Sequence, residues 1–134
     1  MCLPIDAFHN ATLLLKYTLT DAQEVFRNFQ VASRNSTHIT FSWDIVDGYY
    51  SSSYISRFRI YYQERPYTGS RSYIGTISYS SSSLIKIGPS FQYTTTVTSL
   101  SSYGPQFVMW VYVYRPSLNP STVYSDQIYV EMGK

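Results

Sequence analysis

The side chains that could carry out chemistry are few in this sequence. It has one cysteine, Cys2, and two histidines, His9 and His38. A structural zinc site uses four ligands at short paired spacings, so this set predicts no metal site. Asp44 and Asp47, in "DIVDG", resemble the start of a calcium loop, but the downstream acidic ligands of such a loop are absent. We therefore expect a polar turn with Asp47 at its corner.

Catalytic constellations are missing from the sequence as well. Serine is abundant, but no Gly-x-Ser-x-Gly elbow surrounds any serine. The acidic residues are scattered rather than paired, and there is no glycine-rich loop that could hold a phosphate. His38 stands alone at the start of an alternating run, which favours a surface or half-buried histidine over a pH sensor. We expect no enzyme activity and no cofactor.

Two triplets match the acceptor pattern for an N-linked glycan. They are Asn10-Ala11-Thr12 and Asn35-Ser36-Thr37. Asn35 is the better glycosylation candidate, because it lies in the polar stretch "SRNSTH" between two apolar runs. Asn10 is the second candidate. An ordinary turn asparagine is the alternative for Asn35, because asparagine is favoured in turns.

The composition predicts an all-β protein. Of 134 residues, 15 are tyrosine and only 13% are charged. Tyrosine, threonine, valine and isoleucine fit a pleated, half-buried surface, whereas the residues that fill exposed helix positions are scarce. The net charge is only +2, and the sequence contains no run of like charges. We therefore expect no nucleic-acid partner. No apolar run reaches membrane-spanning length, so we expect no membrane insertion of this segment.

Apolar and polar residues alternate from Phe29 onward, as they do in half-buried strands. "ITFSW" places Ile39, Phe41 and Trp43 on one face. The strongest run, "FVMWVYVY", begins at Phe107 and alternates in the same way. Turn signals separate the runs about every 8 to 12 residues, which predicts an antiparallel sandwich or barrel of about seven strands.

The order of these motifs resembles a fibronectin type III domain over about residues 28–132. Trp43 ends the second strand, and "FRIYY" resembles the third strand of that family. "VTSL" resembles the turn before the sixth strand, "FVMWVYV" the sixth strand, and Ser125 with "DQIYVEM" the closing serine and last strand. One departure is Phe107, which stands where the family has a tyrosine whose hydroxyl bonds back to the preceding corner. The proline common before the first strand is also missing.

The resemblance implies a seven-stranded antiparallel immunoglobulin-like β-sandwich over residues 28–134. The side chains expected in its core are Trp43, Phe41, Phe58, Ile60, Tyr62, Leu100, Phe107 and Val111.

Residues 1–27 differ from the rest and are expected to be an N-terminal extension, a linker or the tail of a preceding domain. "ATLLLKYTLT" fits a strand or a short helix equally well. "TDAQEVFRNF" contains a helix start, with Thr20 or Asp21 as N-cap and Glu24 near the third position. The first residues lack the pattern of a signal peptide, so we expect an extracellular protein to carry its signal upstream of this segment.

Two aromatic groups are candidates for a binding surface. The outward face of "FVMWVYVY" carries Trp110, Tyr112 and Tyr114, and Tyr61 on the neighbouring strand would extend it. Aromatic residues are enriched in protein interfaces. The alternative is cross-strand packing, covered by the N-terminal extension or by arginine stems from Arg57 and Arg59. The second group lies in the tyrosine-serine loop after the second strand and consists of Tyr49, Tyr50 and Tyr54.

The resemblance implies a non-catalytic extracellular module of a larger cell-surface or adhesion protein. Such a module would act as a spacer and a protein-binding domain, with a glycan at an occupied acceptor site. A ligand-binding module of a receptor ectodomain is one alternative. An intracellular sandwich domain in a scaffold or in an accessory region of an enzyme is another. A protein partner is expected in each case, and the sequence does not identify it.

Overall fold

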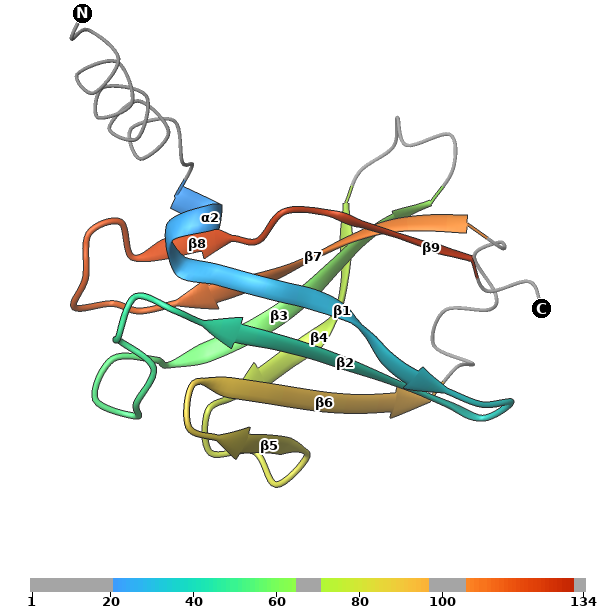
Figure 1. Cartoon of the computed structure of the whole chain (residues 1–134), viewed down its shortest axis with the longest axis horizontal. Coiled ribbons are helices and arrows are strands. Elements are labelled where there is room, and N and C mark those ends of the chain that lie inside the picture. Colours follow the sequence, from blue (N-terminus) through green and yellow to red (C-terminus); the bar gives the residue numbers. More distant parts are fainter. Residues whose placement is uncertain (1–20, 65–70, 97–105, 132–134) are drawn as a thin grey trace, which may run out of the picture.

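The computed structural model describes residues 21–64, 71–96 and 106–131. These residues form one short helix and two antiparallel sheets that face each other (Figure 1). The elements are α2 (Asp21–Val25), β1 (Phe26–Arg34), β2 (His38–Ile45), β3 (Arg57–Glu64), β4 (Ser72–Ser78), β5 (Leu84–Ile87), β6 (Ser90–Thr96), β7 (Gln106–Tyr114), β8 (Thr122–Tyr124) and β9 (Ile128–Glu131).

The strand order makes the molecule a β-sandwich. Sheet A has the order β1-β2-β6-β5, and sheet B has the order β4-β3-β7-β8, with β9 also paired to β7. All the ladders are antiparallel. The all-β sandwich predicted from composition and alternation is therefore confirmed. The described strands number nine rather than the predicted seven; one reason is that β8 pairs with the end of β7 before the chain reaches β9.

The core lies between the inner faces of the two sheets, where the alternation places it. Trp43 on β2 meets Phe58 of the opposite sheet edge-on, with ring centroids 5.0 Å apart, and stacks on Phe91 of β6 at 6.2 Å. Within the described residues, the buried indole Nε1 of Trp43 has no hydrogen-bond partner. The core residues expected from the sequence are buried wherever the structure describes them: Phe41, Trp43, Phe58, Ile60, Tyr62, Phe107 and Val111. Leu100 lies outside the described residues.

The chain before residue 28 contributes to the sandwich from Asp21 onward. α2 is a single turn and lies in the stretch where the sequence predicts a helix start, whereas the N-cap candidate Thr20 lies outside the described residues. Val25 and Phe26 are buried in the same core cluster as Trp43, and the amide of Val46 donates to the carbonyl of Val25 at 2.8 Å. The domain boundary expected after residue 27 thus falls inside β1, because β1 pairs with β2 from Phe26.

Candidate binding surface

The outward aromatic residues of β7 are covered rather than exposed. β7 lies between β3 on one side and β8 and β9 on the other. Its side chains are buried on both faces from Phe107 to Val113. Trp110 is 9% exposed and Tyr112 is 6% exposed, although both point away from the core. A partner that docks on this surface would therefore meet the side chains that cover Trp110 and Tyr112, and not the two rings themselves.

Three arginine side chains cover these rings. The guanidinium carbon of Arg57 lies 4.4 Å from the ring centroid of Tyr114, that of Arg59 lies 5.6 Å from Tyr112, and that of Arg71 lies 4.4 Å from Trp110. These are cation–π distances. We call Arg57, Arg59 and Arg71 the arginine ladder. The cover by Arg57 and Arg59 is the alternative that the sequence left open. Arg71 is not predicted as part of this cover, because it lies in the stretch "ERPYTGSRS", whose proline and glycine indicate a loop.

Four tyrosine rings gather beside the arginine ladder. Tyr61 on β3 lies at the centre, with ring centroids 5.3 Å from Tyr73, 5.8 Å from Tyr112 and 5.5 Å from Tyr124. We call these four residues the tyrosine cluster. Tyr73 and Tyr124 are 45% and 37% exposed. Neither is among the candidates that the sequence predicts, although the alternation of "YIGTISY" is a signal that could place Tyr73 beside Tyr61.

The electrostatics of this face favour protonated groups. The hydrogen bond from Arg59 to the Tyr61 hydroxyl, at 3.4 Å, is the main cause that raises the pKa of Arg59 above its usual value. Burial, and then the proximity of Tyr61, raise the pKa of the Tyr124 phenol. Both groups therefore hold their protons more tightly than usual. The outer face of sheet B presents guanidinium cations together with hydroxyl donors.

The arginine ladder has no carboxylate partner among the described residues. In that part of the chain the one ion pair joins Arg115 to Asp47, with Nη1 and Oδ2 2.8 Å apart. Glu131 on β9 accepts a hydrogen bond from Gln106 at 3.2 Å, four residues along β7 from Trp110. Within the described ranges, no carboxylate therefore pairs with the guanidinium groups of the ladder.

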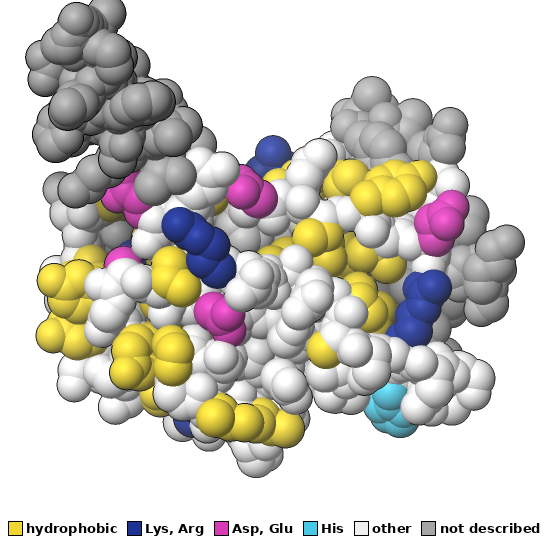
Figure 2. All heavy atoms as spheres, viewed as in Figure 1, with side chains coloured by type: hydrophobic (Ala, Val, Ile, Leu, Met, Phe, Trp, Pro, Cys, Tyr) yellow, Lys and Arg dark blue, Asp and Glu magenta, His cyan; other side chains and the backbone are white. Residues whose placement is uncertain are grey.

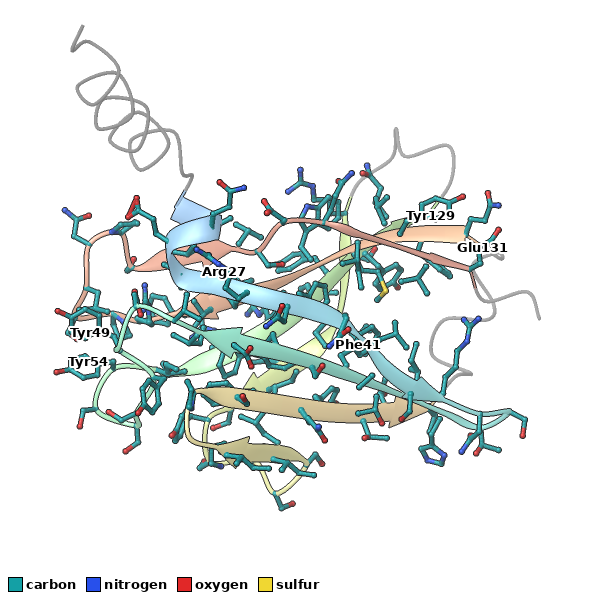
Figure 3. The ribbon with its side chains drawn as sticks, viewed as in Figure 1. Arg27, Phe41, Tyr49, Tyr54, Tyr129 and Glu131 are labelled. Atoms are coloured by element: carbon teal, nitrogen blue, oxygen red, sulfur yellow. The ribbon has the colours of Figure 1, made fainter. Side chains whose placement is uncertain are left out.

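The tyrosine-serine loop between β2 and β3 is held in place by specific contacts. Tyr49 and Tyr54 pack edge-on with ring centroids 4.8 Å apart, at one end of the sandwich (Figure 3). Tyr50 is half-buried against the core, and its carbonyl accepts the Tyr79 hydroxyl at 3.3 Å. Of the three tyrosines predicted as a binding loop, only Tyr49 is exposed, at 43%.

Asp47 occupies the turn corner that the sequence predicts for it. Its carboxylate accepts the Tyr49 amide at 3.1 Å, and the next residue, Gly48, has a φ of 92°, which favours glycine. The same carboxylate pairs with Arg115, which is only 3% exposed. Sequence analysis missed Arg115, because a single arginine after β7 gives no sign of a partner so far away in the sequence.

Asn35 lies in the exposed turn between β1 and β2. Its side-chain oxygen accepts hydrogen bonds from the Thr37 amide at 2.8 Å, the Thr37 hydroxyl at 3.0 Å and the His38 amide at 2.8 Å. Since the oxygen makes these bonds, the amide nitrogen that would carry a glycan is left available. His38 is exposed beside it, with Nδ1 2.9 Å from the Thr37 hydroxyl. Asn10 lies outside the described residues.

A groove runs between β1 and β9, the edges where the two sheets come together. One part of about 330 Å³ is lined by residues that include Arg27 and Asp126, and a second part of about 260 Å³ lies between Val31 and Tyr129. The Arg34 guanidinium donates to the Glu131 carbonyl across it. Figure 2 shows hydrophobic side chains in the gap between these strands, with charged side chains placed singly around it. Ser125 and Asp126 both line the first part, where the Ser125 hydroxyl donates to the backbone carbonyl of Asp126.

Among the described residues, no group of three or more histidine, cysteine, aspartate or glutamate side chains could hold a metal ion. No helix in the same ranges is both long and apolar enough to cross a membrane. Comparison of the chain with protein-family models and with curated proteins gave no match.

Proposed function

We propose that this chain is a non-catalytic extracellular module of the fibronectin type III kind. It belongs to a larger cell-surface or adhesion glycoprotein, where it acts as a spacer and as a protein-binding domain. The ordered motifs around Trp43, "FRIYY" and "FVMWVYV" support the family. The strand order of the two sheets is compatible with an immunoglobulin-like arrangement.

The contacts of Ser125 also support the assignment to this family. In the resemblance it is the serine that precedes the last strand. Its hydroxyl accepts the Val111 amide at 2.9 Å and donates to the Asp126 carbonyl at 2.9 Å. These bonds satisfy β7 at the point where the chain passes from β8 to β9, so the serine has a structural role there.

The observation that carries the binding function is the outer face of sheet B. It combines exposed tyrosine rings with arginine side chains, and both residue types are enriched in protein interfaces. Tyrosine supplies large contact area with little loss of side-chain entropy. The exposed rings are Tyr73, Tyr124 and Tyr129, which are 45%, 37% and 55% exposed.

The receptor alternative would use the other end of the molecule. Tyr49 is exposed there, beside a hollow of about 390 Å³ that is lined by Asp47, Arg115 and Pro120 among others. A hollow of this size can hold part of a small ligand. We place this alternative second, because Tyr50 and Tyr54 are half-buried in the loop itself.

Localisation is tested on the natural full-length protein, expressed with a tag in secretory cells. We expect the tag to be labelled at the cell surface, and a glycosidase that removes N-glycans to reduce the mass. Asn35→Gln should remove part of that mass difference while leaving surface labelling in place. A protein confined to the cytosol would contradict the extracellular assignment.

Binding is tested by screening the secreted module against displayed cell-surface proteins. The combined variant Tyr73→Ser, Tyr124→Ser and Tyr129→Ser should lose the partner while keeping its circular dichroism spectrum. A matched control on sheet A, Ile85→Ser with Ile87→Ser, should keep the partner, because both isoleucines are also exposed. A partner that binds both variants equally would show that the outer face of sheet B is not the site.

A further inference from the structure

The arginine ladder follows β7 at a constant interval. Arg71, Arg59 and Arg57 lie within cation–π distance of Trp110, Tyr112 and Tyr114, which are alternate residues of one strand. The Arg59 guanidinium lies closer to Tyr73 of β4, at 4.5 Å, than to Tyr112, at 5.6 Å. Alternate residues of a strand lie about 6.6 to 6.8 Å apart. The three arginines therefore accompany successive outward positions of β7, with Arg59 leaning toward β4. Two of them come from β3 and one from the residue before β4.

Stacking orients the guanidinium groups without using up their donors. A guanidinium that lies over a ring offers its face to the ring and keeps its N–H groups in its own plane. Arg59 Nε donates to the Thr76 hydroxyl at 3.0 Å, and Arg57 Nη2 lies 3.5 Å from the Tyr112 hydroxyl. Each arginine has more N–H donors than these bonds use. The remaining donors suit carboxylates, which accept arginine in a two-bond geometry.

The spacing along β7 and the positive charge of the three arginines together indicate what kind of ligand would fit. Side chains at alternate positions of an extended polypeptide have the same spacing as the outward positions of β7. We propose that the arginine ladder binds an extended acidic segment of a partner protein, whose carboxylates occupy alternate positions and each pair with one ladder arginine. This inference rests on the proposed function, since it gives the chemistry of the protein partner at the same face.

The surroundings of the arginine ladder suit a polypeptide better than a nucleic acid strand. Proteins that bind single strands leave aromatic faces open so that bases stack on them. Here Trp110 and Tyr112 are 9% and 6% exposed beneath the guanidinium groups. The net charge of the chain is also only +2. Tyr73 and Tyr124 stand beside the arginines with exposed rings and could contact the apolar atoms of a peptide.

The test uses two synthetic peptides of the same composition. One is acetyl-Glu-Thr-Glu-Thr-Glu-amide, and the other is its isomer acetyl-Thr-Glu-Glu-Glu-Thr-amide. The Kd of each for the whole chain is measured by NMR titration at low ionic strength. We expect the alternating peptide to bind more tightly, with the largest shifts in β3 and β7, and to weaken as salt is added.

Single variants then assign the binding to the arginine ladder. Arg59→Gln should weaken binding of the alternating peptide roughly 1.5-fold to fivefold, the range expected for one exposed ion pair. Arg71→Gln should weaken binding by a similar factor. Arg71 is exposed and precedes β4, so this variant is expected to fold even if Arg59→Gln does not. Arg27→Gln is the matched control: it removes one positive charge from β1, on the other sheet, and should leave the Kd unchanged (Figure 3).

Three results would overturn the ladder proposal. They are equal affinity for the two peptide isomers, equal weakening by Arg27→Gln and Arg59→Gln, and tighter binding of a single-stranded oligothymidylate at the same salt. Failure of the proposed function gives a different pattern. A peptide that binds as expected to a protein confined to the cytosol would remove the extracellular assignment and keep the ladder. A surface partner lost with the tyrosine variant, but with no peptide preference, would remove the ladder alone.

Discussion

The two outer faces of this sandwich are built from the same alternation and have opposite chemistry. On sheet A, β2 points Thr40, Ser42 and Asp44 outward, and their partners on β6 are polar as well. The Thr40 and Thr94 hydroxyls are 2.7 Å apart, and the Ser90 hydroxyl donates to Asp44 at 2.7 Å. On sheet B the corresponding positions carry arginine and aromatic side chains.

The size of the outward side chains explains why the two central strands are buried differently. β2 is buried at every second residue, whereas β7 is buried at successive residues. Short hydroxyl side chains satisfy one another across the ladder and leave the sheet surface open to water. Large rings expose apolar area, and long arginine stems can cover it while the charges stay in water. The outer face of sheet B thus acts as a second, thinner packed layer.

The two outer faces also differ in what they leave available for a binding partner. On sheet A the outward polar contacts between β2 and β6 pair hydroxyls and a carboxylate with one another. On sheet B the packing is between cations and rings, and the described carboxylates do not neutralise the cations. A face that stabilises its own strands can therefore still attract an acidic partner.

The largest expected loss of stability comes from a substitution in the core, and it should exceed the loss from a substitution on either outer face. Trp43→Ala should lower the free energy of unfolding by about 3–5 kcal/mol, because it leaves a cavity between the sheets. Trp43→Phe should cost much less, since it also removes an indole N–H without a described partner. Urea denaturation followed by tyrosine fluorescence measures both. A smaller loss for alanine than for phenylalanine would contradict this account of the core.

The second prediction tests whether the outer layer of sheet B is packed. Trp110→Ala should lower the free energy of unfolding by about 1–3 kcal/mol, less than Trp43→Ala, because Arg71 can settle onto the space left behind. Arg71→Gln should cost about 0.5–1 kcal/mol through the lost cation–π contact. Loss of less than the Arg71→Gln value in Trp110→Ala would show that the layer contributes no packing.

The inner layer could be predicted from the sequence, because it depends on the local period alone. Ile39, Phe41 and Trp43 share a face in any strand of that register, and two such faces must meet. The cover over β7 could not be predicted in full, because it depends on which strands lie next to β7. Arg71 reaches Trp110 only because β4 pairs with β3 and β3 pairs with β7.

The contacts of the loop after β2 also depend on residues that are far apart in the sequence. The turn at Asp47 is a local signal, and its corner is where the sequence predicts it. The ion pair that anchors this turn joins Asp47 to Arg115, 68 residues apart in the sequence. The last strand was likewise predicted as one run near the end, whereas β8 forms earlier by pairing with Tyr112 to Tyr114. Contacts between distant segments decide both features.

The third prediction compares one side chain from each outer face. Tyr61→Leu should cost about 1–2 kcal/mol, because Tyr61 contacts three other rings of the tyrosine cluster. Thr40→Val should change stability by less than about 0.5 kcal/mol, since it removes one exposed hydroxyl pair and adds a residue that favours strands. Thermal unfolding of the two variants measures the difference. Equal losses would mean that the two faces stabilise the sandwich in the same way.

The smallest expected effect is a dependence of stability on alkaline pH that arises on sheet B. Burial and the nearby Tyr61 raise the pKa of Tyr124 in the folded chain. Above the usual pKa of tyrosine, about 10, the unfolded chain loses this proton first while the folded chain keeps it. Unfolding then releases a proton, so stability falls as the pH rises through the folded pKa of Tyr124.

Tyr124→Phe should flatten this alkaline fall in the free energy of unfolding, measured by urea denaturation between about pH 9 and pH 11. The effect is small because the ring is 37% exposed and water screens the charge that forms. Thr94→Val, on the outer face of sheet A, is the control, since it removes a hydroxyl of comparable exposure without a titrating proton in this range. Identical slopes for Tyr124→Phe and the parent chain would place the alkaline sensitivity outside the tyrosine cluster. The cluster would then differ from the threonine pair of sheet A in packing alone.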